Sequence, residues 1–350
     1  MANDAEIQYR MSNGTGWITL NRPQALNALS FEMIEKLYEI LKLWQEDNNI
    51  SMICIEGEGN KAFCAGGDVK ALYDLKDNNV EAYAFNFFST EYGMNMTMHT
   101  YPKPILAYMN GIVMGGGVGI SVGASHRIVT EKTKWAMPEM NIGLFPDVGG
   151  SYFLNKMPGY IGRYLALTST AIDSSDVLYI GAADYYIDSN QWCALKKAIE
   201  DRKWSINTAK ANLTELIGQF CTKSYPPSSL EGLQKKIDEC FRFETMEEIL
   251  DALKRSAKAG DLWAEKTLNT LMEKSPTSMK VTLQQLIRGR EKSMLECFKM
   301  ELIMSMNFMK SHDFFEGVRA VLVDKDRNPI WKPGTLEEVK EEDVLLFFSI

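Results

Sequence analysis

Histidine is scarce in this chain, with three residues among 350, and the six cysteines form no C-x-x-C pair. A histidine-rich metal site is therefore not expected, and the scattered cysteines predict free thiols rather than a zinc site. No apolar run approaches the length that is needed to cross a bilayer. The 38 Lys and Arg residues are outnumbered by 46 Asp and Glu residues, which gives a formal net charge of −8. This balance argues against a nucleic-acid partner and against binding to an anionic membrane.

The first ten residues carry early acids and lack an apolar segment. We therefore expect neither a signal peptide nor a transit peptide, and a cytoplasmic location in which the cysteines stay reduced. Hydrophobic residues make up 45% and charged residues 24% of the chain, as in an ordinary globular protein. A chain of this length can form one large domain or two.

Short apolar runs alternate with helical patterns along the first half of the chain, which predicts an α/β fold. Strands are expected at 17–20, 52–55, 105–108, 112–114, 126–130 and 183–187. Helices are expected at 30–45, 69–75 and 80–99, and at further places after residue 150. From residue 190 onward the pattern is helical throughout. We therefore divide the chain into a core, residues 1–190, and a helical C-terminal region, residues 191–350, with a break at 225–229 inside that region.

Two glycine turns follow buried strands. One is A-F-C-A-G-G-D, from Ala62 to Asp68, and the other is M-G-G-G-V-G, from Met114 to Gly119. Glycine lets the backbone turn sharply and approach another group closely. A turn that opens a helix also presents N–H groups without intrahelical partners. Two such turns can supply two N–H donors to one carbonyl oxygen, which is the arrangement of an oxyanion hole.

Two carboxylates follow the second turn in loops that contain proline and glycine. Glu139 lies in M-P-E, and Asp147 lies in G-L-F-P-D-V-G-G. An acid in such a loop often does no more than cap a neighbouring turn. Beside an oxyanion hole, however, it can act as a general acid or base or as a nucleophile in acyl chemistry.

These segments, in this order, resemble the crotonase (enoyl-CoA hydratase/isomerase) superfamily and, within it, the 3-hydroxyisobutyryl-CoA hydrolases. The likeness extends to N-R-P with L-N-A-L near residue 25 and to two later segments, S-P-T-S-M-K-V-T-L-Q-Q-L and H-D-F-F-E-G-V-R-A-V-L-V-D-K-D-R-N-P-I-W-K-P. It therefore covers nearly the whole chain. The resemblance implies a crotonase-like β-β-α spiral core, although the sequence itself shows no repeat.

The resemblance also assigns roles to residues. The backbone N–H groups of Gly67 and Gly116 would form the oxyanion hole. Glu139 would either activate water or attack the thioester, and Asp147 would bind the substrate hydroxyl or place the water. Further substrate contacts would come from the residues Glu91, Asn27, Ala65, Gly66 and Asp68. On its own, Glu91 looks like an ordinary helix residue. Only the family resemblance marks it as a substrate contact.

The residue at position 119 distinguishes two candidate reactions, hydration and hydrolysis. Hydratases that resemble this segment carry a glutamate at this position, which glycine cannot replace. The resemblance therefore favours hydrolysis of a short 3-hydroxyacyl-CoA, such as 3-hydroxyisobutyryl-CoA in valine breakdown. No metal and no cofactor would be needed, because the CoA thioester is itself the substrate. An enoyl-CoA hydratase or isomerase and a non-catalytic acyl-CoA-binding protein are the alternatives, and a homo-oligomer is an open expectation.

Two other sites were weighed against this one. The segment does not match the G-x-G-x-x-G motif of a dinucleotide site, because Ile120 stands where the third glycine would follow Gly115 and Gly117. Cys64 could be a nucleophile, but no histidine stands out as its base, and a packing cysteine is favoured. Four basic residues were considered for the CoA phosphates, namely Arg22, Lys70, Arg319 and Lys325. His312 and Glu316 were expected to fix local packing.

Overall fold

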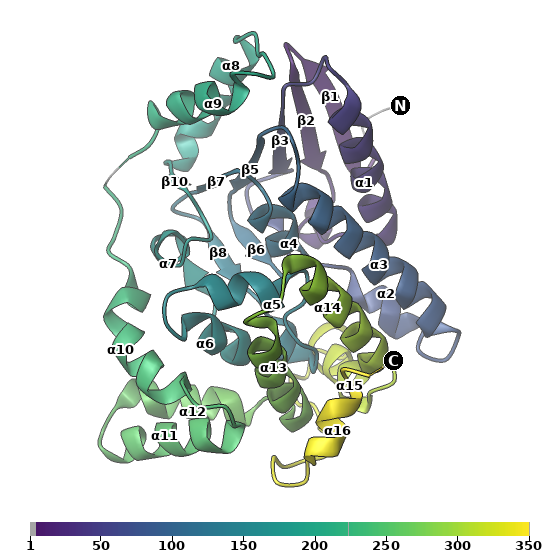
Figure 1. The fold of residues 1–350 in the computed structure, drawn as a ribbon, viewed down its shortest axis with the longest axis vertical. Coiled ribbons are helices and arrows are strands. Elements are labelled where there is room, and N and C mark those ends of the chain that lie inside the picture. The colour runs from purple at the N-terminus through teal and green to yellow at the C-terminus, as the bar shows by residue number, and fades with distance from the viewer. Residues whose placement is uncertain (1–4, 223, 350) are drawn as a thin grey trace. The chain divides into compact units, whose positions relative to one another are not determined.

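The computed structural model describes residues 5–222 and 224–349 (Figure 1). The chain divides into two compact units, which are described separately. Unit 1 comprises Met1–Asp68, Gly93–Ala136 and Ile172–Ser229, and unit 2 comprises Val69–Tyr92, Met137–Ala171 and Leu230–Ile350. The chain therefore passes between the units several times, and these boundaries are not the single one near residue 190. The division into a core and a tail stays a prediction, although unit 1 does end at the expected break at 225–229.

Unit 1 is built on two sheets. The larger sheet has the order β1-β2-β3-β5-β7-β10, and its strands are β1 (Ile7–Ser12), β2 (Thr15–Leu20), β3 (Met52–Gly57), β5 (Ile105–Met109), β7 (His126–Val129) and β10 (Tyr185–Tyr186). The smaller sheet has the order β4-β6-β8-β9, and its strands are β4 (Ala62–Cys64), β6 (Ile112–Met114), β8 (Lys134–Ala136) and β9 (Ile172–Asp173). The pairing is parallel except at β1 with β2 and at β8 with β9.

The order of elements shows the expected β-β-α repeat. Strands β3 and β4 precede the helix α2 (Val69–Asp74), and β5 and β6 precede α4 (Gly116–Val122). In both repeats the first strand joins the larger sheet and the second joins the smaller one. The Asn110-Gly111 turn therefore links strands of different sheets and does not form a hairpin. A hairpin does form at Asn13-Gly14, where both residues have positive φ, and the sequence analysis missed its first strand, β1.

The remaining helices of unit 1 cover its sheets. They are α1 (Phe31–Glu46), α7 (Ser174–Tyr179), α8 (Trp192–Glu200) and α9 (Ala209–Gly218), with short 3₁₀ turns η1 (Pro23–Ala25) and η4 (Ser189–Gln191). Helix α1 begins as expected, because the side chain of Ser30 accepts a hydrogen bond from the N–H of Met33 at 3.2 Å. Its buried face carries Met33, Leu37 and Leu41, which follow the helical period. The predicted helix at 30–45 is thereby confirmed.

Unit 2 is mainly helical. In addition to α2 and the first part of α3 (Val80–His99), it contains η2 (Glu139–Ile142), α5 (Gly150–Phe153), η3 (Leu154–Lys156), α6 (Ile161–Thr168), α10 (Ser229–Phe241), α11 (Met246–Lys258), α12 (Leu262–Met272), α13 (Pro276–Gly289), α14 (Met294–Phe308), α15 (His312–Val318), η5 (Arg319–Val323) and α16 (Glu341–Leu346). Helices α13 and α14 both pack against α5 (Figure 1). The loop that precedes α5 carries Asp147.

The close packing of α4 on β4 gives a stability prediction. A Cβ at Gly117 would lie 2.3 Å from the carbonyl oxygen of Cys64, a backbone atom that cannot move cheaply. We expect Gly117→Ala to lower the free energy of unfolding by about 1–3 kcal/mol, as overpacking does. Gly232→Ala is the control, because nothing lies within 4 Å of its Cβ position in α10. That change is expected to leave stability equal or higher. Urea denaturation of both variants tests this, and equal stabilities would contradict the close packing.

Candidate active site

The first glycine turn is fixed by hydrogen bonds from the residues on either side of Gly67. The N–H of Ala65 donates to the carbonyl of Leu26 at 3.0 Å, and that of Asp68 donates to the carbonyl of Leu29 at 2.8 Å. In the described part of the chain, no protein acceptor pairs with the N–H of Gly67. Gly66 has a φ of +119°, which only glycine adopts readily. The turn therefore leaves the N–H of Gly67 available to donate a hydrogen bond to a ligand.

The second glycine turn lies beside the first. A Cβ at Gly66 would be 3.7 Å from the backbone nitrogen of Gly116 and 3.4 Å from the carbonyl oxygen of Met114. Gly116 is buried and is the first residue of α4, so its N–H has no acceptor within the helix. Unit 1 thus places two glycine turns side by side, each with a backbone donor. Gly119 lies on the next turn of α4, buried and without a side chain.

Cys64 and Asn95 are two further buried side chains of unit 1. The thiol of Cys64 donates to the carbonyl of Gly66 at 3.7 Å, as a packing cysteine beneath the turn can. Asn95 on α3 is fully buried, and within the described residues neither polar atom of its amide has a hydrogen-bond partner. A buried amide without partners is costly, so Asn95 marks a place where a bound ligand could supply them. The sequence analysis missed Asn95, which looks like any polar helix residue.

Several expected substrate contacts have side chains that are engaged elsewhere. The amide of Asn27 accepts from the N–H of Arg22 at 2.9 Å and donates to two backbone carbonyls. Asp68 accepts from the guanidinium of Arg22 at 2.8 Å. Any contact of Asn27 with substrate would therefore use its backbone. Arg22 is engaged by Asp68, and Arg319 is engaged by three acids of its own segment.

Unit 2 gathers the three acids that were expected to act. Glu91 on α3 is 2% exposed, and Glu139 at the start of η2 and Asp147 are each 6% exposed. One carboxyl oxygen of Glu91 and one of Glu139 are buried without a hydrogen-bond partner in the described part of the chain. Asp147 accepts a hydrogen bond from the phenol of Tyr92 at 2.7 Å. We call Glu91, Glu139 and Asp147 the acid cluster.

The acid cluster holds protons more tightly than ordinary carboxyls do. Burial, and then the negative charge of Asp147, raise the pKa of Glu91 and of Glu139 well above the usual value. Burial also raises the pKa of Asp147 to about 6, although the hydrogen bond from Tyr92 opposes the shift. The cluster therefore passes through a mixture of charged and protonated carboxyls at higher pH than exposed acids do. Such a mixture can both take up and deliver protons.

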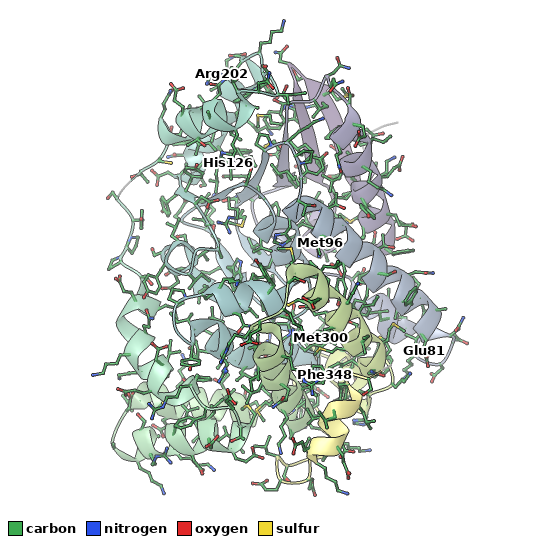
Figure 2. All side chains as sticks on the ribbon, in the orientation of Figure 1. Glu81, Met96, His126, Arg202, Met300 and Phe348 are labelled. Carbon is green, nitrogen blue, oxygen red and sulfur yellow. The ribbon has the colours of Figure 1, made fainter. Side chains whose placement is uncertain are left out.

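A second set of residues supports the cluster, and the sequence analysis missed it. The hydroxyl of Ser305 lies 2.8 Å from the oxygen of Tyr92, which in turn donates to Asp147. The carboxyl of Glu301 accepts from the backbone N–H of Gly149 at 2.7 Å and of Ser151 at 2.8 Å. Glu301 and Ser305 lie one turn apart on α14, the helix on which Figure 2 labels Met300. Their only sequence signal is that they are polar residues within an apolar helix.

No group of three or more His, Cys, Asp or Glu side chains in residues 5–222 and 224–349 is arranged to hold a metal ion. Among those same residues, no helix has the length and the apolar character that a bilayer crossing requires.

The fold is that of the crotonases. A solved structure described as a carnitinyl-CoA dehydratase from Mycobacterium thermoresistibile superimposes with a TM-score of 0.91 at 34% identity, over 99% of this chain and 97% of that one. An enoyl-CoA hydratase structure from Rhodobacter sphaeroides gives 0.89 at 34% identity, with the same coverage. The model of the enoyl-CoA hydratase/isomerase family matches residues 15–348. The chain therefore belongs to that family, as the glycine turns predicted.

Curated relatives show which members of the family this chain is similar to. A protein from Danio rerio named 3-hydroxyisobutyryl-CoA hydrolase, mitochondrial, is 43% identical over 99% of this chain and 90% of its own length. The human protein of the same name is 41% identical over 97% of this chain and 87% of its own length. The Arabidopsis thaliana 3-hydroxyisobutyryl-CoA hydrolase 1 is 39% identical over 100% of this chain and 93% of its own length. The expectation of a cytoplasmic location is wrong, because the vertebrate relatives are named as mitochondrial. The early acids of the amino terminus were a poor guide to location.

The raised pKa of Glu139 predicts how stability depends on pH. A carboxyl whose pKa is higher in the folded state stabilises the fold fully below its unfolded value, and this contribution is lost as pH rises through the folded pKa. We expect Glu139→Gln, which is neutral at every pH, to exceed the wild type in unfolding free energy at pH 8. The difference should shrink as pH falls toward 4.5. Urea denaturation at several pH values measures it, with the exposed Glu342→Gln as control. A difference independent of pH would contradict the buried cluster.

Proposed function

We propose that the chain hydrolyses 3-hydroxyisobutyryl-CoA to 3-hydroxyisobutyrate and coenzyme A, a step of valine breakdown. The proposal is supported by relatives of that name, which align with nearly the whole chain at 39–43% identity. The observation that carries it is the acid cluster, in which three carboxyls share one buried region and keep protons at a pH where exposed acids lose them. Thioester hydrolysis needs both a group that takes a proton and a group that returns one.

The oxyanion donors are assigned to unit 1. The N–H groups of Gly67 and Gly116 would bind the thioester carbonyl oxygen and stabilise the charge that develops there when the carbonyl is attacked. One donor of this kind contributes roughly 3–4 kcal/mol to the transition state, because it is already oriented before the reaction. Backbone donors suit this role, since they are fixed by the turn and cannot rotate away.

Glu139 has two routes open to it. As a general base, its carboxylate takes a proton from water while the water oxygen attacks the carbonyl, and the departing thiolate takes that proton when the C–S bond breaks. As a nucleophile, it attacks the carbonyl itself, expels the thiolate, which is protonated as it leaves, and forms a mixed anhydride that water cleaves. In either route Asp147 would orient the substrate hydroxyl or the water, with Glu91 as a further substrate contact.

The proposal needs no metal and no redox cofactor, because hydrolysis transfers no electrons and the protonatable groups are already in the chain. The acyl-CoA ester is a small-molecule partner, and assembly with identical chains stays a prediction. The basic residues that bind the CoA phosphates are not assigned, because Arg22 and Arg319 are already paired with acids. Lys325 stays a candidate.

Hydration of an enoyl-CoA is the second candidate, and it is favoured by the descriptions of the two similar structures. Gly119 argues against it. Hydration across a double bond uses two carboxyls to handle one water, and the resemblance places one of these at position 119, where this chain has no side chain. A binding protein without activity would have no need for three buried carboxyls, which cost stability.

Thiol release tests the proposed reaction. We expect purified protein to release thiol from 3-hydroxyisobutyryl-CoA and from 3-hydroxypropionyl-CoA faster than from acetyl-CoA, read with a colorimetric thiol reagent. Glu139→Gln and Asp147→Asn are each expected to lower kcat by about 10²–10⁴, the usual range for lost acid–base catalysis. Loss of crotonyl-CoA absorbance without free thiol would show a hydratase instead. Binding of the esters without either signal would leave a binding protein.

The pH dependence of thiol release gives a further prediction. Asp147, with a pKa of about 6, and Glu139, with a pKa raised well above the usual value, must each lose a proton to act as a carboxylate. We expect kcat/KM to rise from pH 5 to pH 8. An ordinary exposed carboxylate would give a profile that is already flat above pH 5.5. A flat profile would therefore contradict catalysis by the buried acids.

A further inference from the structure

The residues that bear Asp147 form a strained turn, which one internal hydrogen bond closes, from the N–H of Gly150 to the carbonyl of Asp147 at 2.8 Å. We call residues 146–151 the Asp147 turn. Val148 has a φ of +49° and Gly149 a φ of +91°. A β-branched residue in the left-handed region is strained, and such strain persists only where the surroundings fix the backbone. The position of the Asp147 carboxyl therefore depends on what contacts this turn.

The contacts come from helices that lie more than 130 residues later in the chain. The amide of Gln285 on α13 donates to the carbonyl of Pro146 at 2.6 Å and to the hydroxyl of Ser151 at 2.9 Å. The carboxyl of Glu301 on α14 accepts from Gly149 and Ser151, using one oxygen for each N–H. The turn is thus held at both ends, on the two sides of Val148.

Glu301 also shares its helix face with the residue that acts on the side chain of Asp147. Ser305 lies four positions later, and its hydroxyl can donate to the oxygen of Tyr92 while the phenol donates to Asp147. Helix α14 therefore fixes the backbone of the turn through Glu301 and the carboxyl through Ser305 and Tyr92. All of these residues belong to unit 2.

A simple structural role explains Glu301 poorly. Its side chain is fully buried, and no Lys or Arg among the described residues pairs with it. Burial raises its pKa to about 8, against the effect of the two N–H groups, and the charge of Asp147 raises it further. A buried carboxyl without a cation is expensive, and an apolar residue at this position would leave the N–H groups of Gly149 and Ser151 without this acceptor. What the carboxyl offers is two acceptors at a fixed spacing, which match the two N–H groups of the strained turn.

We propose that Glu301 is a positioning residue for hydrolysis: it holds the Asp147 turn in the conformation in which Asp147 can act on the substrate. This inference rests on the proposed hydrolase function. It makes part of the C-terminal helical region a component of the catalytic apparatus, although Glu301 itself does not contact the substrate.

The test compares two glutamates of the same helix. Glu301→Gln keeps the size of the side chain but has one oxygen, so it can accept only one of the two N–H groups. We expect kcat for thiol release to fall about 10- to 100-fold, as small misplacements of catalytic groups do, with KM changed less than threefold. The control is Glu296→Gln, which removes the exposed capping-box acid at the start of α14. That change is expected to lower thermal stability slightly and leave kcat unchanged.

Hydrogen exchange supplies a readout that is independent of turnover. In Glu301→Gln, the amides of residues 147–153 are expected to exchange faster than in the wild type, and in Glu296→Gln they are not. Glu301→Asp keeps two acceptors one methylene further away, and it should recover part of the kcat. It also serves as the test variant if the glutamine protein does not fold.

The outcomes separate the two proposals. No thiol release by the wild type would overturn the hydrolase function, and with it this inference. An active wild type with an unchanged kcat in Glu301→Gln would overturn the role of Glu301 alone. A lowered kcat without faster exchange at 147–153 would also overturn it, because the loss would not have passed through the turn.

Discussion

Buried carboxyls without cations are the constraint on which unit 2 depends. Glu91, Glu139, Asp147 and Glu301 are each at least nine-tenths buried, and among the described residues none forms an ion pair with Lys or Arg. Each charge that forms in such a place opposes the formation of the next, so the cluster retains protons that exposed acids would lose. The fold accepts this cost in stability, and the surrounding helices supply neutral donors in place of cations.

Neutral donors affect the pKa values of these buried carboxyls differently from cations. A lysine or arginine beside Asp147 would favour the carboxylate forms of Asp147 and of its neighbours, and would oppose the upward shift of their pKa values. The phenol of Tyr92 instead donates a hydrogen bond to Asp147, which stabilises the charge there and keeps the pKa of Asp147 near 6. The pKa values of Glu91 and Glu139 stay well above the usual value. Unit 1 contains the two glycine turns, which lie side by side.

Local signals in the sequence predicted much of the fold. Ser30 caps α1, and the period of apolar residues gave the helix its length. The helix at 80–99 was also confirmed. The short glycine turns pointed to the family, because Gly66 and Gly117 meet steric demands that other residues cannot meet. Strand β1 was missed although its residues alternate between apolar and polar, and of its three apolar side chains only Ile7 is buried.

Long-range contacts could not be predicted in the same way. Glu301 and Ser305 meet the Asp147 turn and Tyr92 only after the chain has folded over more than 150 residues, and nothing near them in the sequence records those partners. Asn27 shows the converse, since its place in a recognised motif suggested substrate contact while its amide is engaged by backbone groups. A motif predicts where a residue lies better than which of its atoms are available.

The most direct test of this account is a crystal structure with a stable analogue of 3-hydroxyisobutyryl-CoA, in which a methylene group replaces the thioester sulfur. We predict that its carbonyl oxygen lies about 2.7–3.1 Å from the backbone nitrogens of Gly67 and Gly116. The acyl hydroxyl is predicted to lie within hydrogen-bond distance of Asp147, and a carboxyl oxygen of Glu139 should contact the carbonyl carbon or a water beside it. A carbonyl bound away from both glycine amides would contradict the account.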